Sequence, residues 1–187
     1  MKKTCLFSFA LAAVTAVSLP PALHAQATAA ATRGGMAQVG VAYTTSNQDE
    51  FKQRLQGVTI YGTFDLNNNF GLEGDVHMMS ILKSYYSYTE SSYDVGLRYV
   101  RHYRSFSPYA KGLIGFGHSQ TPSPNEIYGG NTPGTYMLFA LGGGLDYGLT
   151  NKINIRIVDF EYQRWPNFPP HGLTPAPVSF GIAYRLR

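Results

Sequence analysis

The chain has 187 residues, enough for one domain, and only 14% of them are charged, against roughly 25% in an average soluble domain. Aromatic residues also reach 14%, with 14 tyrosines and a single tryptophan, a composition that suits a membrane interface. The net charge is only +4, and because Lys2 and Lys3 fall in the leader described next, the remainder is too small to indicate a nucleic-acid-binding surface.

Residues 1–27 have the pattern of a secretory signal peptide, in which lysines precede an apolar run at 6–19 and small residues follow it. Cleavage is expected after Ala27, with Ala25 as the alternative site, and residues 28–35 have the composition of a linker. The apolar run is too short for a stable membrane-spanning helix, and no other segment approaches the length that such a helix needs. Any crossing of a membrane would therefore be made by strands.

Eight segments after the linker alternate in polarity with the period of two that indicates a β-strand. Clusters of Gly, Pro, Asn and Ser separate these segments. The second segment is the clearest, because Val58, Ile60 and Phe64 alternate with Thr59 and Asp65. The predicted strands are residues 36–45, 57–66, 70–78, 93–103, 108–118, 135–147, 152–163 and 178–187.

Two places break the alternation. Arg101 would fall on the apolar face near the end of the fourth predicted strand, which is tolerable only at an interface. In the seventh strand the parity changes beyond Ile157, since Asp159 and Glu161 would otherwise continue the apolar face. This change predicts a β-bulge, or an exit of the strand from lipid, at Val158.

The final predicted strand has an apolar face without charge and an opposite face of small or cationic residues. Within it, Gly181, Tyr184 and Leu186 resemble the closing strand of bacterial outer-membrane β-barrels. Many such proteins end on an aromatic residue, whereas this chain ends on Arg187. Such a strand is expected to be paired along its length.

The connections between the predicted strands alternate strictly between long and short. The long ones are residues 46–56, 81–92, 119–134 and 164–175. In a bacterial up-and-down barrel, short turns face the periplasm and long loops face the outside. The expected fold class is therefore all-β, an eight-stranded antiparallel up-and-down transmembrane β-barrel over residues 36–187.

From residue 36 onwards the chain resembles the small outer-membrane β-barrel domain family, being similar to the transmembrane domain of OmpA and to the opacity-type and Ail-type adhesins. The resemblance rests on the strand pattern and the closing strand. It implies a location in the bacterial outer membrane, contact with outer-membrane lipids, and recognition by the barrel-assembly machinery through the C-terminal strand. It leaves open whether the loops bind an extracellular ligand.

Periodicity does not say which face of the barrel looks outward, so a soluble periplasmic lipocalin-like carrier with an apolar interior is the rival interpretation. The polar faces favour the membrane arrangement, because they hold many glycines and only one or two charges per strand. Buried charges must be paired, and these residues could pair across a closed interior. The expected structural charge network of the lumen consists of Asp65, Glu73, Asp75, Asp94, Arg98, Lys111, Arg156 and Arg185.

Tyrosines and the tryptophan gather near the ends of the predicted strands, as in the aromatic girdles of membrane barrels. The last long connection, with Trp165 and Phe168, is expected to cap the barrel rim and to anchor it at the interface. The expected interface girdle consists of Tyr43, Tyr99, Tyr147, Tyr162 and Trp165.

His118 and Ser119 are the only residues that suggest catalysis, since some outer-membrane barrels of this size are lipid A deacylases or acyltransferases that use His and Ser. Adjacent residues of a strand point to opposite faces, so these two could not readily form the hydrogen bond that activates a nucleophile. Cys5, the one cysteine, would leave with the leader. We therefore expect no catalytic residue, no cofactor and no enzymatic activity.

His77 shares an inward face with Glu73 and Asp75, which could suggest a metal site. A salt-bridge ladder with Arg98 is favoured instead, because no second histidine is placed to complete a coordination shell. We therefore expect no bound metal.

The interior of an eight-stranded barrel is about wide enough for side chains to fill, so a general porin is not expected. The expected role is structural or adhesive, with a side-chain-filled lumen, and the alternatives are a small-ligand binder or a narrow conduit of the outer membrane. The second long connection carries Tyr85, Tyr86, Tyr88 and Tyr93 among serines, a composition that suits a contact surface. A solvated loop is the simpler interpretation of the same residues.

Overall fold

A computed structural model describes residues 35–47, 54–81, 89–120, 134–169 and 171–186 of the chain. The predicted leader, both predicted cleavage sites, Arg187 and the tyrosines at 85, 86 and 88 lie outside these described residues. No helix in the described part of the chain is long and apolar enough to cross a membrane.

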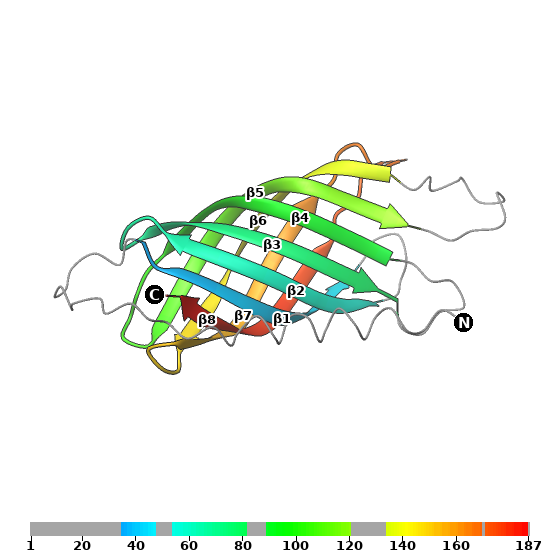
Figure 1. Cartoon of the computed structure of the whole chain (residues 1–187). Helices are drawn as coiled ribbons and strands as arrows, with labels where there is room; N and C mark the ends of the chain where they lie inside the picture. The colour runs from blue at the N-terminus through cyan, green and yellow to red at the C-terminus, as the bar shows by residue number, and fades with distance from the viewer. Residues whose placement is uncertain (1–34, 48–53, 82–88, 121–133, 170, 187) are drawn as a thin grey trace. The chain divides into compact units, whose positions relative to one another are not determined.

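The described residues form one closed barrel in which each strand pairs with its neighbour in sequence and the last pairs with the first (Figure 1). All eight pairings are antiparallel, so the predicted eight-stranded antiparallel barrel is confirmed. The strands are β1 (Ala37–Asn47), β2 (Arg54–Asp65), β3 (Phe70–Ser80), β4 (Thr89–Val100), β5 (Phe106–Gln120), β6 (Gly134–Gly148), β7 (Ile153–Arg164) and β8 (Ala176–Leu186).

The barrel closes between β8 and β1, where Ile182 pairs with Val41 and Gly181 pairs with Ala42. A side chain at Gly181 would meet the Val41 carbonyl oxygen and Ala42, so this seam requires a glycine. Tyr184 continues the pairing opposite Val39. Closure leaves no unpaired strand edge, which is the condition for a sheet to lie in lipid.

Large apolar side chains point outward around the barrel, and most polar side chains point into the lumen. On β8, for example, the outward Phe180 is 48% exposed, whereas its neighbour Ser179 is 1% exposed. An apolar outer band is what lipid requires, and a soluble barrel with an apolar interior would show the reverse.

Each of the three short connections is a tight turn with its own stabilising hydrogen bond or backbone conformation. The Asn67 side chain accepts hydrogen bonds from the backbone N–H groups of Asn69 and Phe70, at 2.9 and 2.8 Å. The Thr150 hydroxyl does the same for Ile153, at 2.9 Å. Between β4 and β5, Arg104 adopts a left-handed conformation with φ of 53°. These turns define one end of the barrel, called the turn end below, and the long connections define the loop end.

Strand boundaries differ from the sequence prediction by up to four residues. The sequence predicts the fourth strand at 93–103, but β4 begins at Thr89 and ends at Val100. Arg101 therefore lies just beyond the strand and is exposed at the turn end, not within the predicted strand. Its position outside the strand removes the cost of a charge facing lipid.

The bulge predicted at Val158 is confirmed by the pairing of β7. Leu145 pairs with Val158 but Asp146 pairs with Arg156, so Ile157 is an extra residue in β7. The register with β8 shifts over the same residues. The extra residue turns every later side chain of the strand to the other face. Asp159, Glu161 and Gln163 therefore point into the lumen.

Candidate functional site

The lumen holds the polar chemistry of the molecule, and its side chains fall into three levels. An apolar plug lies toward the loop end, a charge network lies in the middle, and a small cavity lies at the turn end. Each level is built from residues that alternate with the outward apolar ones, so the period of two along each strand places them there.

Lys111 is the centre of the charge network. Its ammonium nitrogen lies 3.0 Å from Glu73, 2.9 Å from Asp75, 2.8 Å from Asp159 and 2.6 Å from Glu161. These carboxylates come from β3 and β7, on opposite sides of the lumen. The Lys111 side chain is 0% exposed, so it joins these strands in a region without access to solvent.

Two arginines complete the network on the turn-end side of Lys111. Arg98 contacts Asp146 at 2.5 Å and Glu73 at 3.3 Å. Arg156 contacts Glu73 at 3.0 Å and Asp146 at 3.4 Å. Because both guanidinium groups share the same two carboxylates, β3, β4, β6 and β7 are joined through a single buried cluster.

The arginines also stack on two tyrosines inside the lumen. The guanidinium carbon of Arg98 lies 3.9 Å from the ring centre of Tyr109, and that of Arg156 lies 3.7 Å from the ring centre of Tyr61. The Tyr109 hydroxyl donates a hydrogen bond to Asp159 at 2.6 Å. The face of an aromatic ring attracts a desolvated cation. The two tyrosine rings therefore fill the lumen and also stabilise the buried guanidinium groups.

A row of neutral polar groups borders the network. The Thr44 hydroxyl lies 2.8 Å from that of Ser179, and the Thr59 hydroxyl lies 2.6 Å from His77 Nδ1. The other ring nitrogen of His77 lies 3.3 Å from Glu161. His77 thus pairs with Glu161. Of the expected salt-bridge ladder with Arg98, the contact with Glu73 is present at 3.3 Å, whereas His77 and Asp75 pair with Glu161 and Lys111.

The apolar plug contains the only tryptophan of the chain, and the expectation that Trp165 belongs to the outer girdle is wrong. Its side chain is fully buried, and its indole N–H donates to Gln163 at 3.2 Å. The bulge in β7 gives Trp165 the inward parity of Gln163, and Gly117 leaves room for the ring, since a Cβ there would overlap the indole. The plug consists of Leu113, Leu138, Ala140, Trp165, Phe168 and Leu173.

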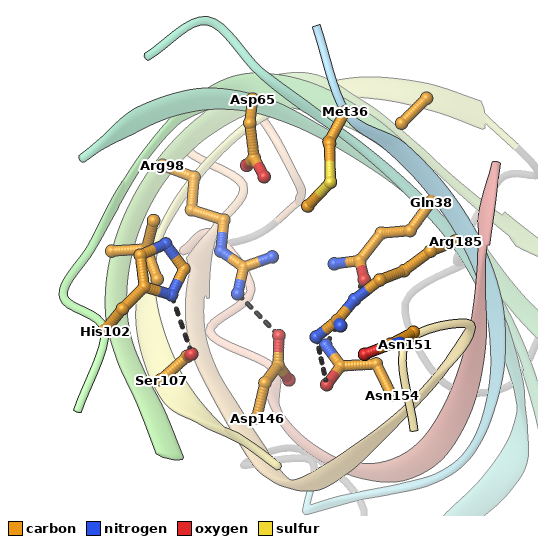
Figure 2. Close-up of a pocket in the computed structure, with 12 residues that line it drawn as sticks. Met36, Gln38, Asp65, Arg98, His102, Ser107, Asp146, Asn151, Asn154 and Arg185 are labelled. Carbon is orange, nitrogen blue, oxygen red and sulfur yellow. Dashed lines mark hydrogen bonds and ion pairs between the residues drawn. The ribbon is translucent and has the colours of Figure 1, made fainter. Parts of the chain in front are cut away.

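At the turn end the lumen opens into a cavity of about 220 Å³. Figure 2 shows Asp65, Arg98 and Arg185 directed into it from different strands. Arg185 donates to Asn154 at 3.2 Å, and His102 lies 2.8 Å from Ser107. The lining residues are Met36, Ala37, Gln38, Asp65, Arg98, Val100, His102, Ser107, Asp146, Asn151, Asn154 and Arg185.

The structure brings together six of the eight residues expected in the lumen charge network, while Asp65 and Arg185 line the cavity at the turn end. The six are Glu73, Asp75, Asp94, Arg98, Lys111 and Arg156. The sequence interpretation missed five further members of this region. They are Tyr61, Tyr109, Asp146, Asp159 and Glu161.

A signal for these missed residues was present in the sequence. Tyr109 and Asp146 have the inward parity of their strands, but neither was assigned to the network. The bulge predicted at Val158 also implies that Asp159 and Glu161 face the lumen and not the apolar side.

The remaining residues of the expected girdle point outward. Tyr43, Tyr99 and Tyr162 are 51%, 40% and 47% exposed. At the turn end, Tyr99 packs against Phe70 with ring centres 5.1 Å apart. Tyr147 makes the same kind of contact with Phe106, at 5.0 Å.

His118 and Ser119 lie on opposite faces of β5. His118 is within 3.3 Å of the Thr135 hydroxyl on the exposed side, whereas Ser119 is 3% exposed and points into the lumen. Their placement does not allow the nucleophile–base contact that hydrolysis by a serine requires.

Comparison with solved structures finds several small outer-membrane barrels of the same fold. Neisserial surface protein A (NspA) matches with a TM-score of 0.64 and 12% identity over 83% of this chain and 99% of that chain. OprG from Pseudomonas aeruginosa matches with 0.57 and 15% identity, over 82% and 97%. Ail of Yersinia pestis, solved with the heparin analogue sucrose octasulfate, matches with 0.54 and 18% identity, over 82% and 99%.

A comparison with curated protein sequences finds no match. The family model described as the outer membrane protein beta-barrel domain matches residues 9–185, which is most of the chain. The closed eight-stranded barrel and its outward apolar band agree with that match. The chain therefore belongs to the outer membrane protein beta-barrel domain family and is an integral protein of the bacterial outer membrane.

Proposed function

We propose that this protein is a non-conducting barrel of the outer membrane whose role is structural or adhesive and is carried by its outer loops. The observation that supports this most directly is the filled lumen. The Lys111 ammonium and its four carboxylate partners occupy the middle of the barrel, and Trp165 is buried above them. A lumen closed at two levels leaves little room for solute passage, so the function is expected at the surface.

The absence of enzymatic activity is part of the same proposal. The residues that the sequence offered for catalysis, His118 and Ser119, face away from each other. Five of the buried carboxylates are engaged by Lys111 and the two arginines in a region closed to solvent, namely Glu73, Asp75, Asp146, Asp159 and Glu161. We therefore assign no catalytic residue and no cofactor.

The second long loop supports an adhesive role over a purely structural one. It carries Tyr85, Tyr86 and Tyr88 among serines, and tyrosine gives a large contact area at low entropic cost. Among proteins of the same fold, Ail is named for attachment and invasion and was solved with a heparin analogue. An attachment function of this chain would use the loop end of the barrel.

Assembly and export belong to the proposal as well. We expect the barrel-assembly machinery to recognise the closing strand through Gly181, Tyr184 and Leu186, of which the last two are outward-facing. We also expect a leader of residues 1–27 to be removed on export.

An adhesion assay tests the proposed function. Bacteria that display the full protein are compared with bacteria that display a variant with Tyr85, Tyr86 and Tyr88 replaced by serine, after surface labelling has shown equal display. We expect the wild type to increase attachment to immobilised matrix protein or heparin and the variant to lose most of that increase. Equal attachment by displaying and non-displaying cells would contradict an adhesive role.

A further inference from the structure

Four ligating side chains from three strands converge at one point of the lumen. They are Asp75 and His77 on β3, Asp94 on β4 and Glu161 on β7. One nitrogen or oxygen atom from each lies within 4.8 Å of the corresponding atoms of the others, and all four residues are buried. Such a separation lets a single ion contact all four groups.

Asp75 and Asp94 are direct partners in the pairing of β3 with β4. Like charges placed directly opposite on neighbouring strands repel each other. Both residues point into the lumen, with 2% and 6% of their surface exposed, so water does not screen the repulsion. The pair therefore requires a positive charge between or beside its members.

Lys111 lies 2.9 Å from Asp75, but among the described residues no lysine or arginine forms an ion pair with Asp94. Neither carboxylate oxygen of Asp94 has a hydrogen-bond partner, and Asp75 Oδ1 also lacks one. His77 Nε2 makes no hydrogen bond either, although it lies 3.3 Å from Glu161. Lys111 reaches Asp75 and Glu161 through their other oxygens, Oδ2 and Oε1. A buried carboxylate without a partner is costly, so these atoms point to a missing ligand.

The charge balance of the lumen points the same way. Among the described residues, the buried carboxylates outnumber the buried lysine and arginine side chains by seven to three. The carboxylates are Glu73, Asp75, Glu90, Asp94, Asp146, Asp159 and Glu161, and the cations are Arg98, Lys111 and Arg156. The two arginines lie with Asp146 on the turn-end side. Of the three buried cations, only Lys111 contacts Asp75 and Glu161, and none forms an ion pair with Asp94.

We propose that Asp75, His77, Asp94 and Glu161 bind one divalent first-row metal ion, of the Mn²⁺ or Zn²⁺ type, in the barrel lumen. The histidine decides the class, because Ca²⁺ and Mg²⁺ take oxygen ligands and imidazole suits transition metals. Zinc accepts histidine and carboxylate ligands together in a four-ligand shell. The sequence offers no second histidine near His77 as a metal ligand. In the structure, Asp94 and Glu161 lie where they could complete the coordination shell.

The ion would join β3, β4 and β7 across the lumen, and this inference goes beyond the surface role proposed above. It adds a metal to the elements that hold the barrel closed. Loss of the ion would therefore change the stability of the barrel and its metal content, and would leave the loops untouched.

For the test, the full protein is first freed of metal with a chelator. It is then folded in detergent micelles in the presence of Mn²⁺, and unbound ions are removed before analysis. We expect about one bound Mn²⁺ per chain by elemental analysis, displacement by Zn²⁺, and an EPR spectrum with nitrogen coupling from His77. Asp94→Asn keeps the size of the side chain and removes its charge, and we expect it to weaken binding about tenfold or more. Asp146→Asn removes a lumen carboxylate outside the four and is expected to bind Mn²⁺ like the wild type.

Folding of each variant is checked by its heat-dependent shift on a gel. His77→Gln provides a second variant, in which the nitrogen coupling should disappear. If Asp94→Asn does not fold, the wild type still decides, because a metal that binds only the folded barrel should raise its unfolding temperature progressively with the concentration of free Mn²⁺. Substoichiometric Mn²⁺ in the wild type, or equal affinity in folded Asp94→Asn and wild type, would overturn the proposal.

Discussion

Arg156 on β7 and Glu73 on β3 form an ion pair at 3.0 Å, although their strands are four steps apart in both directions around the barrel. The pair therefore spans the full width of the lumen. Both side chains are buried, and Glu73 is shared with Arg98 and Lys111. Side chains from opposite walls meet directly, which is the geometric basis for proposing a sealed barrel.

Lys111→Met is expected to destabilise the barrel more than any surface substitution. It removes the cation shared by Glu73, Asp75, Asp159 and Glu161 and leaves their charges buried. Removing one partner of a buried ion pair costs about 3–5 kcal/mol, so we expect a loss of at least that size. Urea unfolding followed by tryptophan emission measures it.

Lys152→Met is the matched control for that variant, because Lys152 is exposed beside a short turn. Its free energy of unfolding should stay close to that of the wild type. Equal stability of the two variants would show that the Lys111 ion pairs contribute nothing to the folded state.

Gly117→Val is expected to displace the plug. A Cβ at this position would overlap the Trp165 indole, so the ring must move toward solvent or the strand must shift. Overpacking of this kind costs about 1–3 kcal/mol. Because Trp165 is the only tryptophan, its emission maximum reports the movement directly and should shift to longer wavelength.

Gly112→Ala serves as the control for the plug variant, since a Cβ there would lie 3.6 Å from Leu141, an ordinary contact. Its emission maximum should match the wild type. An unshifted maximum in Gly117→Val would mean that the glycine does not hold the space for Trp165.

Val95→Arg tests which face meets the lipid. Val95 is 56% exposed and lies near the middle of β4, so a charge there would sit near the centre of the bilayer. We expect a loss of about 2–4 kcal/mol in a lipid bilayer, against about 0–1 kcal/mol near an interface. Leu149→Arg, at a short turn, provides the interfacial comparison, and equal losses at both positions would contradict the assignment of the outer band.

The sequence was sufficient for the fold because the signal is repeated in every strand. Alternation along 57–66 predicted β2, and the same alternation in the last segment predicted the outward face of β8. The predicted ends of the strands were less accurate. For example, β2 begins at Arg54, three residues before the apolar alternation starts. Pairing with a neighbour extends a strand beyond its lipid-facing part, and periodicity does not report that extension.

The site was harder to predict, because parity gives the face of a residue but not its partner across the lumen. Glu73, Lys111 and Arg156 were placed inside correctly by parity, whereas their mutual distances depend on the closure of the barrel. Tryptophan is typical of membrane interfaces, so residue type alone predicts that Trp165 belongs to the outer girdle. The single extra residue in β7 decided its position instead.

Planar-bilayer conductance of the purified wild-type protein shows whether the lumen is sealed. We expect no channel steps above the background of the protein-free bilayer, because Lys111 and its partners block the middle of the barrel and Trp165 blocks the level above. Reproducible channel steps from folded wild-type protein would show that the lumen is open.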